Sequence, residues 1–137
     1  MSIKQLSTNG YEVSSVFSDN LLQELVELSK TFTPTSIRTG GNGTAIREVL
    51  FSTGTIKAKV SKEVVEFLKQ LDINAQVDAI ELWRDYPGYT NYWHMDNPII
   101  KNILIVYLDS TNAGTEYKEN DQHYSVEYNK NTGLILL

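Results

Sequence analysis

Two segments in the first half of the chain repeat hydrophobic residues at helical spacing. The first predicted helix covers residues 18–30, with Ser18 placed to cap its N-terminus. Its apolar positions share one face and are Leu21, Leu22, Leu25 and Leu28. A second helix is predicted to begin at a capping Ser61. Its apolar face comprises Val64, Val65, Phe67, Leu68 and Leu71. Two amphipathic helices are therefore expected.

The other hydrophobic positions follow the shorter spacing of β-strands. Strands are predicted over residues 10–17 and 44–52, and residues 33–43, with Pro34 and three glycines, predict a loop. We interpret that loop as a surface connection in preference to an active-site lid. From residue 77 onward the predicted elements are short strands at 77–85, 89–94, 103–108, 116–118, 123–128 and 134–137. Such spacing is typical of a sandwich or barrel, with the helices packed against one sheet.

Length and composition indicate one ordinary globular domain. The chain has 137 residues, of which 41% are hydrophobic and 21% charged. It has no cysteine, which excludes disulfides, thiolate metal sites and cysteine nucleophiles and favours a cytoplasmic setting. No stretch approaches the roughly 20 apolar residues that cross a bilayer, so no membrane partner is expected. The net charge is −5 and no basic stretch is visible, so a nucleic-acid partner is not expected either.

The candidate chemistry lies in the segment from Tyr86 to Asp96. His94 and Asp96 are two residues apart, and side chains two apart on an extended chain point to the same face. An imidazole and a carboxylate can therefore meet one metal ion from one strand end. A second histidine would complete the two-histidine, one-carboxylate site that leaves positions open on Fe(II). A His-x-Asp triplet alone is weak evidence, so its surroundings decide how it is interpreted.

Those surroundings resemble the prolyl-4-hydroxylase-like branch of the 2-oxoglutarate/Fe(II) oxygenases. As in that family, a strand ends in a tyrosine and a glycine-containing turn, here Tyr86 and Gly88, and an aromatic residue precedes the His-x-Asp triplet. Three further features follow in the family's order and are residues 103–109 (ILIVYLD), 114–117 (GTEY) and 131–137 (NTGLILL). The resemblance covers about residues 80–137. Each of the four features is common by itself, and the resemblance is specific because they occur in the family's order.

The resemblance implies a double-stranded β-helix, the jelly-roll type of sandwich, in an α+β, mainly β chain. It also implies an enzyme that uses Fe(II), 2-oxoglutarate and dioxygen to oxidise a substrate, by hydroxylation or demethylation. Carried over by position, His94 and Asp96 would be the iron ligands and the catalytic centre. Tyr92 and Tyr107 could hydrogen-bond 2-oxoglutarate, and for each a place in the core is the alternative. The substrate, such as a protein side chain or a small molecule, is not identified.

The sequence departs from the family pattern at its end. In the family, a second histidine ligand and a basic residue that pairs with 2-oxoglutarate follow the strand that residues 134–137 match. Neither position is present. We therefore expect a single oxygenase-like domain over residues 1–137 that is truncated before the distal histidine, with the last strands of the sandwich missing.

Two polar residues outside the triplet, His123 and Arg84, are not expected to take part in the metal site. His123 is the only other histidine and lies in a polar run, too early in the chain for the family's second histidine. Arg84 could meet a carboxylate bidentately, and pairing with a surface acid is the preferred interpretation.

Two functional interpretations remain open. The first is an iron- and 2-oxoglutarate-dependent oxygenase of the hydroxylase type. The second is a non-catalytic jelly-roll module for binding or assembly that retains the metal motif. A cupin-like metal protein ranks below both, because cupins usually supply more histidines than this chain contains. An incomplete sandwich exposes strand edges, so we also expect a homodimer through residues 134–137 or the strand around Ile103.

Overall fold

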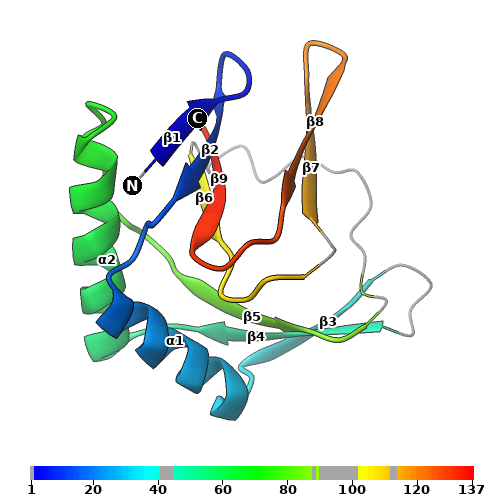
Figure 1. The fold of residues 1–137 in the computed structure, drawn as a ribbon. Coiled ribbons are helices and arrows are strands. Elements are labelled where there is room, and N and C mark those ends of the chain that lie inside the picture. Colours follow the sequence, from blue (N-terminus) through cyan, green and yellow to red (C-terminus); the bar gives the residue numbers. More distant parts are fainter. Residues whose placement is uncertain (1, 41–44, 88, 90–101, 112–113) are drawn as a thin grey trace. The chain divides into compact units, whose positions relative to one another are not determined.

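The computed structural model describes residues 2–40, 45–87, 89, 102–111 and 114–137. The chain divides into two compact units, one formed by Met1–Leu22 and Asn97–Leu137 and the other by Gln23–Asp96. The described part is mainly β, as predicted, with two α-helices and antiparallel sheets (Figure 1).

The first unit is built on a four-stranded antiparallel sheet with the strand order β1-β2-β9-β6. Its strands are β1 (Ser2–Gln5), β2 (Gly10–Ser14), β6 (Ile103–Val106) and β9 (Thr132–Leu136). β9 pairs with β2 on one side and with β6 on the other. Leu134 and Ile135 are accordingly buried, with exposed fractions of 0% and 1%.

This arrangement corrects one prediction. Residues 134–136 do not form an exposed edge, because β9 is a central strand that pairs on both sides. Among the described strands, the edges of this sheet are β1 and β6. The partner β2 lies at the opposite end of the sequence, and a pairing at that separation leaves no local signal. Of the two expected dimer contacts, only the strand around Ile103 remains at an edge.

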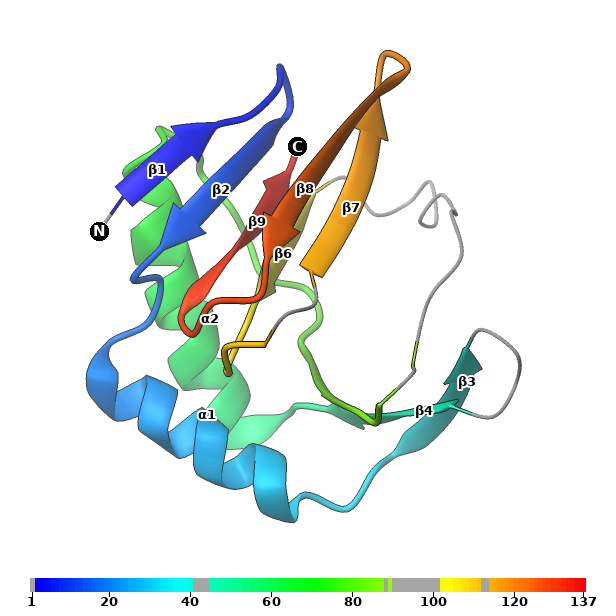
Figure 2. The same cartoon turned by 45° about the vertical axis from the view of Figure 1, so that its right-hand side comes forward.

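A β-hairpin of β7 (Gly114–Glu119) and β8 (Gln122–Glu127) lies beside this sheet (Figure 2). Its turn residues Asn120 and Asp121 both have positive φ, which these residue types tolerate in tight hairpin turns. A buried cluster joins hairpin and sheet and consists of Tyr107, Tyr117, Val126 and Leu134. The predicted strands at 103–108, 116–118, 123–128 and 134–137 are all confirmed as strands with small differences at their ends.

Asn131, in the turn before β9, fastens the segment that leads into the first helix. Its side-chain amide donates to the Phe17 carbonyl at 2.9 Å, and its side-chain oxygen accepts from the Phe17 N–H at 3.0 Å. Its own backbone N–H donates to the Tyr107 carbonyl at 2.7 Å. Asn131 has a φ of 61°, a conformation that asparagine adopts more readily than most residues. Three segments distant in sequence therefore meet at Asn131, two of them joined by its side chain and the third by its backbone N–H.

The second unit contains a three-stranded antiparallel sheet with the order β3-β4-β5. Its elements are α1 (Asp19–Thr31), β3 (Ser36–Gly40), β4 (Ala45–Phe51), α2 (Gly54–Lys69) and β5 (Glu81–Asp85). The first turn of α1, up to Leu22, is assigned to the first unit. The Lys59 ammonium on α2 lies 3.0 Å from the Glu24 carboxylate on α1. This ion pair connects the two helices at the surface.

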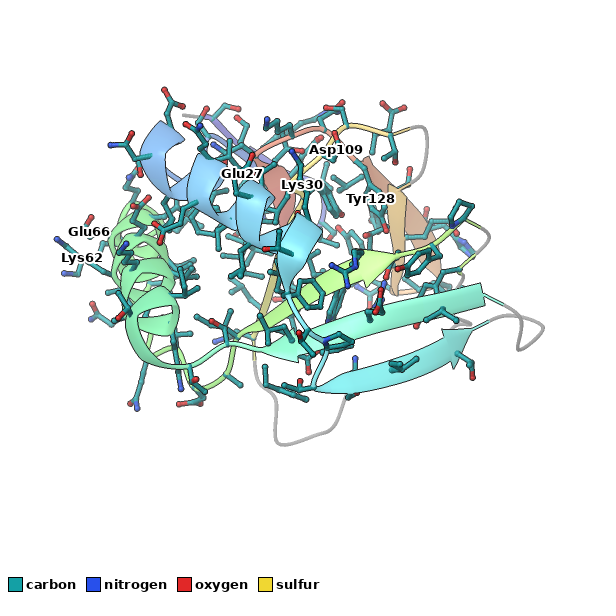
Figure 3. All side chains as sticks on the ribbon, turned by 90° about the horizontal axis from the view of Figure 1, so that it is seen from below. Glu27, Lys30, Lys62, Glu66, Asp109 and Tyr128 are labelled. Carbon is teal, nitrogen blue, oxygen red and sulfur yellow. The ribbon has the colours of Figure 1, made fainter. Side chains whose placement is uncertain are left out.

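The first helix is confirmed within one residue of its predicted ends. The Leu21 N–H donates to the Ser18 hydroxyl at 3.3 Å, which is the expected cap. Leu21 and Leu25 are buried, as their helical spacing predicts. On the exposed side, Lys30 and Glu27 form an ion pair of 3.4 Å, and Figure 3 shows the two side chains together on α1. Among the described residues, no helix is both long and apolar enough to cross a membrane.

The start of the second helix was predicted wrongly. α2 begins at Gly54, so Ser61 lies inside the helix and does not cap it. Thr53 occupies the N-cap position with extended backbone, and its side chain makes no cap hydrogen bond. The buried face comprises Val60, Val64, Phe67 and Leu68, so the apolar stripe also begins before Ser61. A favourable capping residue within a continuous helical pattern was mistaken for its start.

The predicted loop over residues 33–43 contains a strand. β3 pairs with β4 in antiparallel register, with Ile37 opposite Glu48 and Arg38 opposite Arg47. The glycines suggested a loop, but the β-branched residues at 37 and 39 suit a strand once β4 offers a partner. Gly40 is the last residue of the strand, and residues 41–43 lie outside the described part of the chain. The predicted loop is therefore wrong at least for residues 36–40.

Candidate functional site

The predicted metal ligands lie outside the described residues. His94 and Asp96, together with Tyr92, fall within residues 90–101, as does most of the strand predicted at 89–94. The structure describes the chain on both sides of this segment. β5 precedes it and ends at Asp85, as predicted, although it begins at Glu81 and is shorter than expected. β6 follows it from Ile103.

Tyr107, the second residue expected at the co-substrate, directly follows β6 and is buried. Its exposed fraction is 7%, and it belongs to the core cluster of the first unit. Its hydroxyl donates to the Thr115 hydroxyl oxygen at 2.8 Å, and its ring lies 4.3 Å from the Tyr128 ring. Burial raises the pKa of Tyr107 to about 12. The side chain is thus a core residue whose one hydroxyl proton already has an acceptor.

The raised pKa of Tyr107 predicts a loss of stability in alkali. The folded state keeps its proton between pH 10 and about 12, where an unfolded tyrosine releases it. The contribution is therefore complete below pH 10 and is lost as the pH rises towards 12. We expect the unfolding free energy to fall less steeply over this range in Tyr107→Phe than in the wild type, measured by urea unfolding. Burial also raises the pKa of Tyr117. Tyr117 therefore contributes part of the decrease in unfolding free energy that remains in Tyr107→Phe. Equal slopes in the two proteins would contradict this.

A polar network links β4 and β5 on one face of the β3-β4-β5 sheet. Arg84 on β5 donates to the Glu48 carboxylate at 3.0 Å, and Glu48 also accepts from the Tyr86 hydroxyl. Two further Arg84 nitrogens donate to the carbonyls of Ser29 and Phe32 at the end of α1, at 2.9 Å and 3.2 Å. A cation suits this position, since the C-terminus of a helix carries partial negative charge. Arg84 therefore fastens α1 to the sheet.

The charges in this network shift one another's ionisation. The hydrogen bond from Arg84, followed by that from Tyr86, lowers the pKa of Glu48. The same carboxylate raises the pKa values of Arg84 and Tyr86. Arg84 does pair with an acid, as predicted, but through one bond to Glu48 and two to backbone carbonyls. These contacts indicate that Arg84 has a structural role, which is to hold the end of α1 against the sheet.

The opposite face of the same sheet carries a second, more buried arginine. Arg47 on β4 lies directly across from Asp85 on β5 and binds it through two parallel hydrogen bonds of 2.7 Å and 2.9 Å. The Arg47 side chain is only 8% exposed. Its guanidinium carbon lies 3.8 Å from the centre of the Trp83 ring and 4.5 Å from that of the Tyr89 ring. Both distances are within cation–π range.

Sequence reasoning did not single out Arg47. The residue stands in Ile46-Arg47-Glu48-Val49, where two adjacent charges in a strand suggest a solvent-facing edge. One feature of the sequence could have indicated that Arg47 is buried. Side chains alternate along a strand, so Arg47 lies on the same face as Val49, which is fully buried. Identifying its partners also required the β4–β5 register, because Asp85 is 38 residues away. The bidentate pairing considered for Arg84 is found instead at Arg47.

His123 lies on β8 opposite Lys118 and is exposed, as predicted for a surface residue. The described residues contain no group of three histidine, aspartate or glutamate side chains placed to hold a metal ion.

No protein-family model, curated protein or solved structure matches this chain.

Proposed function

We propose that this chain provides the metal-binding strand and surrounding sandwich of an Fe(II)- and 2-oxoglutarate-dependent oxygenase. The observation that carries the proposal is the His94-Met95-Asp96 triplet, placed between β5 and β6 with the family's sequence features before and after it. An imidazole and a carboxylate two residues apart supply two of the three protein ligands of a facial Fe(II) site.

The described strands support the proposal by their positions. The resemblance requires a strand before the triplet and three strand segments after it. Residues 81–85 form β5, and residues 103–106 form β6. Residues 114–117 lie in β7 and residues 132–136 form β9. Each of these four segments therefore contains a strand among the described residues.

A jelly-roll fold is the architecture that we propose for these strands. Within the first unit, the four-stranded sheet and the β7–β8 hairpin share the buried Tyr107, Tyr117, Val126 and Leu134. Antiparallel strands that share a core across two layers are the basic arrangement of a sandwich. This supports the proposal without requiring any contact between the two units.

The donor set fits iron in part. His94 and Asp96 would hold the metal, whose chemistry when bound is the activation of dioxygen with 2-oxoglutarate as co-substrate. No residue of the sequence matches the family's third ligand, and His123 is exposed on β8. Tyr107 would have to release Thr115 before donating its proton to a carboxylate of 2-oxoglutarate. The contribution of this chain is therefore to present one imidazole and one carboxylate from a strand end.

A metal titration tests the proposal. Two protein ligands hold iron poorly, so we expect anaerobic Fe(II) to bind the wild-type chain only weakly. His94→Ala and Asp96→Ala should each weaken this binding further, because each removes a direct ligand. His123→Ala is the matched control and should leave the affinity unchanged. Calorimetry gives the affinities, and succinate release from 2-oxoglutarate in air reports turnover.

The outcomes separate the two functional interpretations. Binding that survives both His94→Ala and Asp96→Ala would show that the ligands were assigned wrongly. Weak Fe(II) binding that is lost in both variants would support the assigned ligands, whereas a wild-type chain that binds no Fe(II) at all would favour the non-catalytic module. Loss of binding in His123→Ala would identify His123 as the second imidazole ligand and correct its interpretation as a surface residue.

A further inference from the structure

The strand β3 is one edge of the second unit's sheet, and its middle is exposed. It pairs with β4 on one side, and among the described strands none pairs with its other side (Figure 1). Ile37, Arg38 and Thr39 are all exposed. Ile37 is 61% exposed, which is the highest value among the large hydrophobic residues that the structure describes. The edges of the four-stranded sheet differ, because β1 carries the exposed, charged Lys4 and all four residues of β6 are half-buried.

The backbone groups of Ile37 and Thr39 point away from β4. In an antiparallel sheet, alternate residues of a strand direct both their N–H and their C=O towards the same neighbouring strand. Ile46 of β4 bonds towards β5, because its carbonyl accepts the N–H of the residue that follows β5 at 3.0 Å. Arg47 therefore bonds towards β3, where it lies opposite Arg38. The residues on either side of Arg38 accordingly present their N–H and C=O groups at the free edge.

Exposed apolar side chains lie on one face of this edge. Ile37 is opposite Glu48, so Ile46, two residues before Glu48, is on the same face. Tyr86 is also on this face, since its hydroxyl donates to the Glu48 carboxylate. Ile46 and Tyr86 are 38% and 47% exposed. The three side chains of Ile37, Ile46 and Tyr86 form an apolar patch that reaches the free edge at Ile37.

We propose that β3 is a homodimer interface, in which β3 of a second copy pairs with it in antiparallel orientation about a two-fold axis at Ile37. In this register the strand is complementary to itself, as an interface with two-fold symmetry requires. Ile37 faces the partner's Ile37, and their outward N–H and C=O groups would exchange two hydrogen bonds. The flanking pairs are Arg38 with the partner's Ser36 and Thr39 with the partner's Thr35. The two apolar patches would then join across the axis.

The charges at this edge favour a second copy in this register. The Arg38 guanidinium already lies 3.1 Å from the Glu81 carboxylate of its own sheet, so pairing encloses no unbalanced charge. With the axis at Ile37, Arg38 faces a neutral serine. With the axis at Arg38 instead, the two arginines would lie directly opposite each other, and like charges in that position are destabilising. The sequence of β3 therefore selects one of the two registers that its outward groups allow.

Single cysteines test the register, because the chain contains none of its own. In the proposed dimer the two Cα atoms at position 37 lie about 5.5 Å apart, which is within disulfide range. Ile37→Cys should therefore form a disulfide-linked dimer under mild oxidation. Arg38→Cys should not, since its two copies lie about 7 Å apart along the strands. Phe51→Cys, exposed on β4 and away from the edge, is the matched control and should stay monomeric. Cross-linking of Arg38→Cys in preference to Ile37→Cys would overturn the proposed register.

Sedimentation equilibrium tests the dimer itself. The average mass of the wild-type chain should rise between about 10 µM and about 1 mM, where weak interfaces associate. Ile37→Lys should stay monomeric, because it places two ammonium groups opposite each other at the axis. Phe51→Lys, the matched control, should associate like the wild type, and urea unfolding should show that both variants fold. A wild-type chain that stays monomeric would overturn the inference. A dimer that persists in Ile37→Lys would also overturn it and would point to another edge, such as β6. Neither result bears on the proposed metal site.

Discussion

Replacement of Gly133 by alanine is expected to prevent the four-stranded sheet of the first unit from forming. Gly133 lies in the central strand β9, between Val13 of β2 and Val106 of β6. A Cβ atom here would overlap the Ile105 carbonyl oxygen and come within 3.1 Å of the Val106 Cα. These are backbone atoms, which cannot rotate away as a side chain can. We expect a loss of about 4 kcal/mol or more in unfolding free energy, measured by urea unfolding followed by circular dichroism.

Gly54→Ala is the control for this experiment. Gly54 has a φ of +63°, but a Cβ atom there would meet nothing within 4 Å. Only the cost of the left-handed conformation remains, which is about 1 kcal/mol. If Gly133→Ala were no more destabilising than Gly54→Ala, the close approach of β6 to β9, and with it the register of the sheet, would have to be revised.

The second large effect is expected at Phe67 on α2. Its exposed fraction is 3%, and it lies on the helix face that also buries Val60, Val64 and Leu68. Truncation to alanine removes a buried ring and leaves a cavity, for which the usual cost is about 3–5 kcal/mol. Thermal and urea unfolding should both show this loss. This loss of unfolding free energy should be at least as large as the loss caused by any conservative change to the exposed ion pairs on the two helices, because exposed ion pairs contribute little to stability.

Phe51→Ala provides a control with the same chemical change. Phe51 is the last residue of β4 and is 45% exposed, so less apolar surface returns to water when its ring is removed. We expect a loss of about 1 kcal/mol or less at this position. Similar losses of unfolding free energy for Phe51→Ala and Phe67→Ala would mean that the face of α2 that carries Phe67 is not buried.

Arg47 and Arg84 lie on the same sheet but make different contacts. Both sit on neighbouring strands and both meet a carboxylate across the β4–β5 ladder. Arg84 connects the sheet to the end of α1, whereas Arg47 contacts the residues around the turn that follows β5. The alternation of side chains along a strand separates these roles onto opposite faces.

Local patterns determined much of the secondary structure. The cap at Ser18 and the spacing of the leucines after it predicted α1, because helix hydrogen bonds and helix faces involve residues three or four apart. The apolar run from Ile103 and the short strands predicted at 116–118 and 123–128 correspond to β6 and to the two strands of the β7–β8 hairpin. The His94–Asp96 site was also inferred from local sequence, and it stays a prediction.

Features that depend on distant residues were decided only by the tertiary structure. β3 is a strand because β4 pairs with it, although its glycine and its flanking residues resemble a loop. β9 is central because β2, more than a hundred residues earlier, lies beside it. Arg47 is buried because Asp85, Trp83 and Tyr89 meet it across a strand register. The sequence by itself determined which segments can be helix or strand, since those preferences act between neighbours. Only the fold decided which strands pair and which charges are enclosed, since both depend on contacts between segments far apart in the chain.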